Sequence, residues 1–234
     1  MVDAVRAALR RHANPEKAVF LQRFFKTGKG EYGEGDCFLG VTVPEQRRVA
    51  RAFAGLELEE IAELLASPMH EERLTALIIL ANRFRRAAPA ERRRIYAFYM
   101  RQRRRVNNWD LVDLSAPYIV GPSASAGRLA RLARSPNVWD RRIAMVATFD
   151  ATRKGDPAPA LRIAEMLLHD EHDLIHKAAG WMLREVGKRC GAAELKGFLD
   201  RHAATMPRTM LRYAIEWLPE PERRKYLAAR DVML

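Results

Sequence analysis

Apolar residues recur at helical spacing along almost the whole chain, and short breaks rich in proline, glycine and serine separate the apolar stretches. Leu74, for example, is followed three and four positions later by Leu77 and Ile78, so the three share one face of a helix. No stretch alternates apolar and polar residues with the period of a β-strand. The pattern therefore predicts an all-α chain. The expected helical stretches are 2–26, 44–53, 57–66, 70–86, 89–105, 108–120, 124–133, 138–153, 158–168, 173–189, 192–204, 208–218 and 221–230.

A repeat of about 35 residues lies within this series. Positions 73, 108, 142, 177 and 212 are equivalent places near the start of a helix, separated by 35, 34, 35 and 35 residues. Each of these helices follows another helix and a break. A fixed period of helix pairs is typical of an α-solenoid, whose stacked units bury a continuous core. The W-x-x-L-G pattern of tetratricopeptide repeats is missing. We therefore expect HEAT-like helical repeats that form a single domain over residues 1–234.

The charge of the chain indicates what kind of partner it binds. Its 234 residues carry a formal net charge of +12. Ten arginines lie between Arg83 and Arg105, accompanied by a single acid, Glu91. A solvated helix face normally intersperses acids, and arginine binds phosphate in a bidentate manner, so this run favours phosphate contact. We expect a concave basic groove that binds nucleic acid.

Several protein classes are excluded. No stretch reaches the roughly 18 uninterrupted apolar residues that a membrane span needs, and the N-terminus lacks the apolar core of a signal peptide. Two cysteines, Cys37 and Cys190, are too few for a disulfide framework or a metal knuckle. Cys37 is predicted to be a buried structural thiol. These features predict a cytoplasmic protein, nucleoid-associated when bound to DNA, that does not associate with membranes. The repeat period and the arginine run predict a monomeric solenoid.

Two further patterns are weak. Gly28, Gly30 and Gly33 spell G-x-G-x-x-G, but a helix precedes them where a nucleotide fold needs a strand, so we expect a mobile loop or one that approaches other backbone. The histidines at 169, 172 and 176 suggest a metal site by spacing alone. They span a probable helix boundary, and no H-E-x-x-H pattern occurs. We expect no metal and no cofactor.

The candidate chemistry follows the arginine run. Trp109 and Asp113 are four residues apart, on one face of a helix. A carboxylate beside an indole, reached through arginines, suits chemistry on an electron-poor group attached to a polyanion. The alternative is a core tryptophan with an ordinary surface aspartate. In a solenoid, Arg142 and Lys177 occupy equivalent places on successive helices, and Trp181 follows Lys177 by four residues. These five side chains can therefore converge on one groove.

Four short motifs, in this order, carry a resemblance to a known family. They are Phe38-Leu39-Gly40-Val41 with Pro44-Glu45-Gln46-Arg47-Arg48, Trp109-Asp110-x-x-Asp113, Trp139-x-x-Arg142, and Gly180-Trp181-x-Leu183-Arg184-Glu185. With them the chain resembles the AlkD-like DNA alkylation repair enzymes, which are HEAT-like-repeat DNA glycosylases, over nearly its whole length. The resemblance implies removal of positively charged alkylated bases, such as 3-methyladenine and 7-methylguanine, from duplex DNA.

The resemblance also implies roles for individual residues. Asp113 corresponds to the catalytic aspartate, Trp109 and Trp181 to the two tryptophans that flank the lesion, and Arg142 to the arginine that grips a phosphate. The glycine-rich loop over 28–35 is longer than is usual in the family. The further DNA-binding candidates are Arg47, Arg48, Lys177 and the loop tyrosine Tyr32.

Two other functions remain open at this point. A non-catalytic HEAT-like scaffold that binds nucleic acid or an acidic protein would explain the repeat and the arginines equally well. It would not need Asp113 beside Trp109. An RNA-binding adaptor is a third possibility, and affinity for duplex DNA compared with structured RNA distinguishes it.

Overall fold

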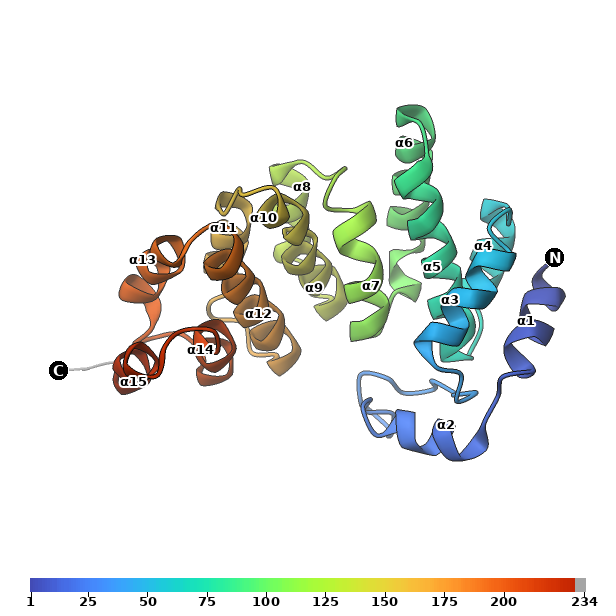
Figure 1. Cartoon of the computed structure of the whole chain (residues 1–234), viewed down its shortest axis with the longest axis horizontal. Helices are drawn as coiled ribbons and strands as arrows, with labels where there is room; N and C mark the ends of the chain where they lie inside the picture. Colours follow the sequence, from blue (N-terminus) through green and yellow to red (C-terminus); the bar gives the residue numbers. More distant parts are fainter. Residues whose placement is uncertain (230–234) are drawn as a thin grey trace. The chain divides into compact units, whose positions relative to one another are not determined.

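The computed structural model describes residues 1–229, and within them every regular element is a helix (Figure 1). The one strand-like feature in this part of the chain is an isolated bridge between Cys37 and Met69. The predicted all-α helical-repeat class is confirmed. The helices are α1 (Val2–Arg10), α2 (Pro15–Gln22), α3 (Val43–Ala52), α4 (Leu58–Leu65), α5 (His70–Arg86), α6 (Pro89–Gln102), the 3-10 helix η1 (Arg103–Arg105), α7 (Trp109–Ile119), α8 (Ala126–Ala133), α9 (Val138–Ala147), α10 (Phe149–Arg153), α11 (Ala158–Met166), α12 (Asp173–Arg189), α13 (Ala192–His202), α14 (Arg208–Ile215) and α15 (Glu220–Ala228).

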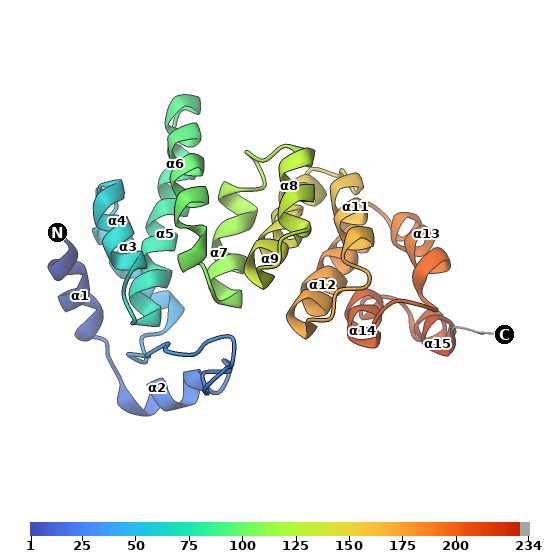
Figure 2. The same ribbon diagram turned by 180° about the vertical axis from the view of Figure 1, so that it is seen from behind.

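The chain forms two compact units, Met1–Ile119 and the part from Val120 onward. Helix pairs make up each unit: α4 with α5 and α6 with α7 in the first, and α8 with α9 and α11 with α12 in the second, where α13 and α14 both pack on α12 (Figures 1 and 2). Of the 34–35-residue positions, 73 and 177 fall near the starts of α5 and α12, whereas 142 and 212 lie near the middle of α9 and α14. Asn108 differs, because it immediately precedes α7 and its side-chain oxygen accepts a hydrogen bond from the backbone N–H of Trp109.

The first unit is built around α5. Helices α3, α5 and α7 pack side by side in one layer, and α4 and α6 cover the other side of α5. Because α5 is enclosed from both sides, its apolar residues do not keep to one stripe, and Leu77, Ile79 and Leu80 are all at most 1% exposed. This burial fixes the layer to which α7 belongs.

The second unit is built around α12, which packs against α9, α11, α13 and α14. Gly180 allows the closest of these contacts. A Cβ atom at this position would lie 2.4 Å from the carbonyl oxygen of Met210 and 2.5 Å from the Cβ of Tyr213. Any side chain at position 180 would therefore push α14 away from α12.

The N-terminal region departs from a simple core-facing pattern. The stretch expected to be helical over 2–26 is two helices, because α1 ends at Arg10 and Asn14 caps α2 by accepting from Lys17 N at 2.9 Å. No residue of α2 is buried. Val19, Phe20 and Phe24 are 61%, 55% and 59% exposed. Their helical spacing therefore does not mark a face packed against the core.

The prediction that Cys37 is a buried thiol is wrong, because its side chain is exposed. Two backbone hydrogen bonds hold this residue in an extended conformation: Cys37 N donates to Pro68 O at 3.0 Å, and His70 N donates to Cys37 O at 2.8 Å. Side chains alternate along extended backbone. Asp36 on one side of Cys37 points inward, with a side chain 6% exposed, and Cys37 therefore points outward.

The glycine-rich loop over 28–35 is closed by its own hydrogen bonds. Gly33 N donates to Lys26 O at 2.8 Å, and the carboxylates of Glu31 and Glu34 accept from Gly28 N and Gly30 N, each at 2.8 Å. A Cβ at Gly33 would lie 2.9 Å from Lys26 O, so glycine permits this close approach of backbone to backbone.

Among the described residues, no helix is long and apolar enough to span a membrane.

Candidate active site

Helix α7 carries the two residues at the centre of the predicted chemistry. Trp109 is its first residue, and Asp113 follows one turn later. Both residues are half-buried. The sequence places them on one helix because Asn107 and Asn108 end the preceding segment, and the Asn108 side-chain oxygen accepts from Trp109 N at 2.7 Å. The spacing of four residues therefore brings an indole and a carboxylate to the same side of α7.

One face of the Trp109 indole lies against Phe25, which follows α2. Their ring centroids are 5.2 Å apart with an interplanar angle of 19°. Phe25 also stacks on Phe38 at 5.1 Å and contacts the ring of His70 at 4.9 Å. The N-terminal segment thus supplies an aromatic stack that supports Trp109 from one side.

A cluster of charged side chains lies beside this stack. His70, the first residue of α5, has one ring nitrogen 3.3 Å from Asp36 and the other 2.6 Å from Asp110, and its side chain is 3% exposed. Arg73, one turn along α5, donates to Asp36 and to the side chain of Asn107. Burial alone would lower the pKa of His70, but hydrogen bonds to Asp110 and Asp36 outweigh it and raise this pKa to about 9.

The same contacts keep Asp36 ionised. Burial would raise the pKa of its carboxyl, but the hydrogen bond from His70 and the charge of Arg73 lower this pKa below its usual value. Asn108 adds a hydrogen bond to Asp36 at 2.8 Å. The first turn of α7 is therefore tied to the loop before α3 and to the start of α5.

The motif over 38–41 has a separate anchor. The buried carboxylate of Glu71 accepts hydrogen bonds from the backbone N–H groups of Leu39, Gly40 and Val41 at 2.8–3.2 Å. Gly40 has φ +78°, and a Cβ there would lie 2.1 Å from Asn14 O, so only glycine fits. This motif thus fixes the segment that carries Phe38 and Asp36.

The arginine run divides over two ends of α6, which shares a layer with α4 rather than with α7. The arginines at 83, 85, 86, 92, 93 and 94 surround the turn between α5 and α6, and those at 101, 103, 104 and 105 lie at the far end of α6, just before α7. Within α6 the nearest members of the two groups, Arg94 and Arg101, are seven residues or about 10 Å apart along the helix. The second group therefore lies in the chain next to the turn that leads to Trp109.

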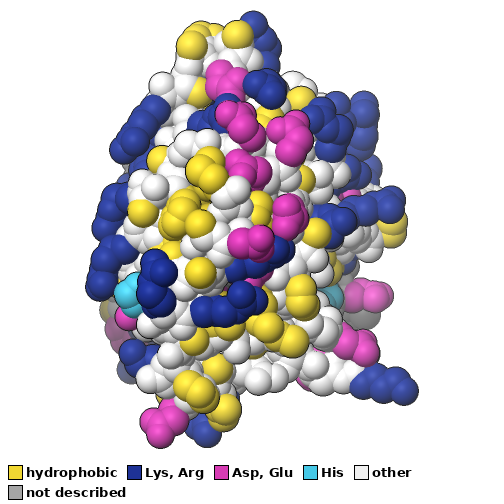
Figure 3. Space-filling view, turned by 90° about the vertical axis from the view of Figure 1, so that its right-hand side faces the viewer, with side chains coloured by type: hydrophobic (Ala, Val, Ile, Leu, Met, Phe, Trp, Pro, Cys, Tyr) yellow, Lys and Arg dark blue, Asp and Glu magenta, His cyan; other side chains and the backbone are white. Residues whose placement is uncertain are grey.

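Acids balance the basic charge elsewhere in the first unit. Figure 3 shows a band of Asp and Glu side chains flanked by Lys and Arg side chains. Within α1 and α4, Arg6 pairs with Asp3 at 3.2 Å and with Glu63 at 3.0 Å. Arg47 and Arg48 on α3, by contrast, are exposed. Arg47 lines a small pocket of about 60 Å³ together with residues of α5 and α7, among them Asn82, Arg85 and Tyr118.

The remaining predicted residues lie in the second unit. Arg142 on α9 is 5% exposed and donates from Nη1 to Leu174 O at 2.6 Å. Lys177 on α12 pairs with Asp173 at 2.7 Å, and its side chain is 42% exposed. Trp181, one turn further along α12, is half-buried. α12 therefore brings a lysine and an indole to one side of a helix, as α7 does for an indole and an aspartate.

Phe149, the first residue of α10, contacts Trp181. Their ring centroids are 6.3 Å apart with a tilt of 35°. The guanidinium of Arg189 lies 5.1 Å from the centroid of Phe149. The aromatic neighbour of Trp181 is thus itself covered by a cation.

The sequence profile of one family, described as DNA alkylation repair enzyme, matches residues 5–218. The chain belongs to this family. All eight predicted site residues lie within the matched range. The prediction of a DNA alkylation repair enzyme is confirmed at the level of the family.

A solved structure gives the same fold. It is a predicted DNA alkylation repair enzyme from Enterococcus faecalis, with a TM-score of 0.67 and 16% sequence identity, and the match covers 89% of this chain and 98% of that one. At this identity the likeness shows the fold alone. No curated protein matches the chain in sequence.

Two other predicted features are the loop tyrosine and the histidines at the start of α12. Tyr32 is in the glycine-rich loop, where its hydroxyl donates to Phe24 O at 3.5 Å. The histidines at 172 and 176 hold the turn before α12: His172 Nδ1 accepts from Leu174 N at 3.1 Å, and a ring nitrogen of His176 contacts Asp170 O. Among residues 1–229 no group of three or more histidines, cysteines or acids could hold a metal ion.

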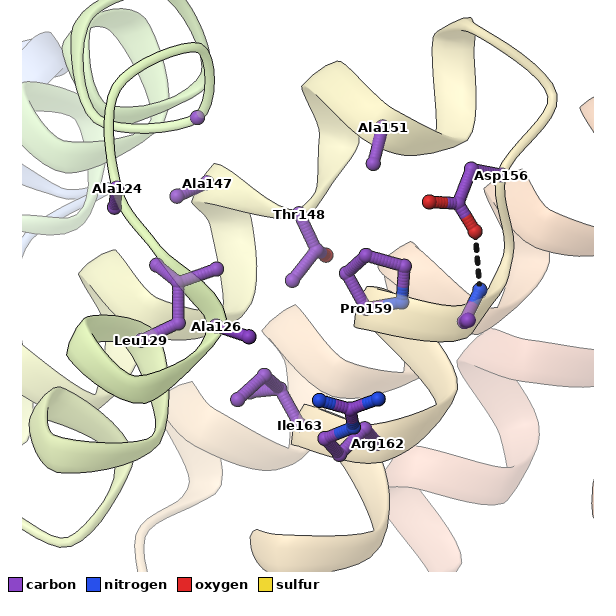
Figure 4. Close-up of a pocket in the computed structure, with 12 residues that line it drawn as sticks. Ala124, Ala126, Leu129, Ala147, Thr148, Ala151, Asp156, Pro159, Arg162 and Ile163 are labelled. Carbon is purple, nitrogen blue, oxygen red and sulfur yellow. Dashed lines mark hydrogen bonds between the residues drawn. The ribbon is translucent and has the colours of Figure 1, made fainter.

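An apolar cavity of the second unit is separate from these residues. It measures about 270 Å³ and lies among α8, α9, α10 and α11. Its walls are mainly alanine and leucine or isoleucine side chains, with Arg162 and Asp156 at one side (Figure 4). The Asp156 carboxylate accepts from Ala158 N at 3.0 Å. None of Arg142, Lys177 and Trp181 lines this cavity.

Sequence reasoning missed the residues that hold Trp109 in place, above all His70 with its two carboxylate partners and Phe25. The partners of His70 lie 34 and 40 positions away in the sequence. No local motif links such distant residues. A histidine at the start of a helix beside Glu71 and Glu72 was the one available signal, and it does not distinguish a surface residue from a buried one.

Proposed function

We propose that this protein is a DNA glycosylase that hydrolyses the N-glycosidic bond of positively charged alkylated bases in duplex DNA. The observation that supports this proposal most strongly is the position of Asp113. Its half-buried carboxylate lies one turn from the Trp109 indole, which stacks on Phe25, in a chain that belongs to the DNA alkylation repair enzymes. An alkylation repair enzyme that acts by hydrolysis needs one such carboxylate and a site for the base.

The chemistry of the lesion explains why one carboxylate suffices. Methylation at N3 or N7 makes the purine cationic, so it leaves without protonation and no general acid is needed. When the bond between C1′ and the base nitrogen breaks, its electron pair neutralises the base, and positive charge develops on the sugar. Asp113 stabilises this oxocarbenium-like charge. It also orients water for attack on C1′, and the water's proton passes to the carboxylate or to solvent.

The indoles supply the complementary surface. Trp109 has one face on Phe25, so its edge and other side serve the lesion. An indole attracts a cation or polarised C–H groups by roughly 0.5–2 kcal/mol. Trp181 has the same role from α12. The proposed phosphate contacts are Arg142, Lys177, Arg47 and Arg48, with Tyr32 as a further contact from the glycine-rich loop.

A base-release assay tests this function. The purified protein is incubated with duplex DNA methylated at guanine N7 or adenine N3, and the free base is separated and identified. We expect release of the free methylated base and formation of an abasic site. Unmethylated duplex and methylated structured RNA serve as substrate controls, and both should yield no free base.

The alternative is a non-catalytic scaffold that binds nucleic acid. Tight, salt-dependent binding to methylated duplex without release of base would contradict the glycosylase and support the scaffold. Higher affinity for structured RNA than for duplex DNA would instead support an RNA-binding adaptor.

A further inference from the structure

Four charged side chains meet at the start of α7. They are Asp36 from the loop before α3, His70 and Arg73 from α5, and Asp110 from α7. The side chains of Asp36, His70 and Arg73 are at most 6% exposed, and that of Asp110 is 18% exposed. Two carboxylates and two cations balance, but only while His70 is protonated.

The geometry around His70 requires an imidazolium. Each ring nitrogen faces a different carboxylate, Asp36 at 3.3 Å and Asp110 at 2.6 Å. A neutral imidazole has a single N–H, so one of its nitrogens would present a lone pair to a carboxylate oxygen. Phe25 and Phe38 contact the ring with centroid distances of 4.9 Å, which limits access of water to the pair. Loss of the proton would therefore break one of the two contacts.

Both carboxylates that contact His70 are connected to Trp109. Asp110 is its neighbour in the chain, and Asp36 accepts from the side chain of Asn108, whose oxygen accepts from Trp109 N. Phe25 contacts both the His70 ring and the Trp109 indole. The backbone and the ring of Trp109 thus depend on the same protonated side chain.

We propose that His70, held as an imidazolium between Asp36 and Asp110, is a positioning residue that fixes the first turn of α7 and the Trp109 indole for base excision. This proposal rests on the proposed glycosylase function. His70 does not touch the substrate; it acts through Asp110, Asn108 and Phe25. Asp36, Asp110 and Arg73 are the charged groups that face it from the loop, from α7 and from its own helix.

Two variants separate positioning from mere structural support. In Asp110→Asn, a neutral His70 donates from Nδ1 to Asp36 and accepts from the new amide at Nε2, so the cluster no longer needs the proton. His70→Gln carries one amide N–H₂ group between two carboxylates and cannot donate to both in the imidazole geometry. His12→Gln is the matched control, because His12 is 38% exposed in the same unit and 4.0 Å from Glu45.

The experiment follows two signals of the full chain from pH 6.5 to 10. One is the indole N–H resonance of Trp109 in an ¹⁵N-correlated NMR spectrum, assigned by its loss in Trp109→Phe. The other is the single-turnover rate of 3-methyladenine release. In the unaltered protein and in His12→Gln, we expect the resonance to shift and the rate to fall at least tenfold with a common midpoint near pH 9. In Asp110→Asn, we expect neither transition in this range.

His70→Gln should give a rate at pH 7 about tenfold below that of the unaltered protein, without the transition near pH 9. The proposal is overturned if the Trp109 resonance does not change near pH 9, or if Asp110→Asn keeps the same transition. Should the unaltered protein release no base at any pH, the proposed function fails. The resonance alone then decides whether His70 positions Trp109.

Discussion

Trp109 and Trp181 have the same proposed role, but the molecule holds them by different means. Trp109 begins its helix, and its supports come from distant parts of the chain: the Phe25 ring and the cluster around His70. Trp181 lies in the middle of α12, where Gly180 lets α14 approach within contact of the helix backbone. Charge and aromatic stacking therefore position the first indole, whereas helix packing fixes the backbone that carries the second, whose ring contacts Phe149.

This difference has a physical consequence. A charged cluster depends on protonation, because each partner keeps its place only while the opposite charge is present. A helix contact through glycine depends on volume and is indifferent to pH. The first unit should accordingly respond to a change in pH and the second to a change in side-chain volume. Three experiments test this difference.

The largest expected effect is a loss of stability at alkaline pH that originates in the first unit. The pKa of His70 is raised from 6.5 to about 9, so its stabilisation is fully present below pH 6.5 and is lost as pH rises through about 9. At 1.36 kcal/mol per pKa unit the loss is on the order of 3 kcal/mol. Urea unfolding between pH 6 and 10 measures it. A His70→Gln variant with the same alkaline loss as the unaltered protein would contradict this assignment.

A smaller effect is expected in the second unit from Gly180→Ala. The added Cβ would lie 2.4 Å from Met210 O, so α14 must shift, and we expect a loss of about 1–3 kcal/mol that does not depend on pH. Gly197→Ala on α13 is the matched control, since a Cβ there meets no atom within 4 Å. Thermal melting of both variants tests the contrast, and equal melting temperatures would refute the packing argument.

The smallest effect on stability is expected for Lys177→Met. Lys177 and Asp173 form a largely exposed i,i+4 pair, so its removal should cost no more than about 0.5 kcal/mol. Binding to duplex DNA should nevertheless weaken for all sequences alike, and the slope of log affinity against log salt should fall by about one. A titration at several salt concentrations measures this, and an unchanged slope would remove Lys177 from the phosphate contacts.

The sequence could predict the helices because their signals are local. The bounds of α5 and α12 follow from apolar spacing between breaks at Pro68, Pro89 and Gly191, and the structure has them at His70–Arg86 and Asp173–Arg189. The contacts of Trp109 could not be predicted, because they join residues dozens of positions apart. The exposure of Cys37 escaped prediction for a similar reason, since a backbone bridge to Met69 decides which way its side chain points.

The arginine run shows a limit of another kind. Its composition indicated a basic surface, but the same arginines divide over two ends of α6, with Arg94 and Arg101 about 10 Å apart along the helix. Arg83 forms an ion pair with Glu91 at 2.7 Å and donates a hydrogen bond to Leu56 O at 3.0 Å. The number of charged residues in a stretch of sequence thus predicts the sign of the surface charge but not where on the surface that charge lies.

The most direct test of the central claim is the single-turnover release of 7-methylguanine from duplex DNA by Asp113→Asn, with thermal melting alongside. Asparagine keeps the shape of the side chain but removes the charge that faces the developing oxocarbenium ion. We expect the rate to fall by about 10²–10³ while the melting temperature changes little. Asp3→Asn, at a side chain 98% exposed, should excise at the unaltered rate. A folded Asp113→Asn protein that excises at the unaltered rate would contradict the glycosylase mechanism and leave a nucleic-acid-binding scaffold in its place.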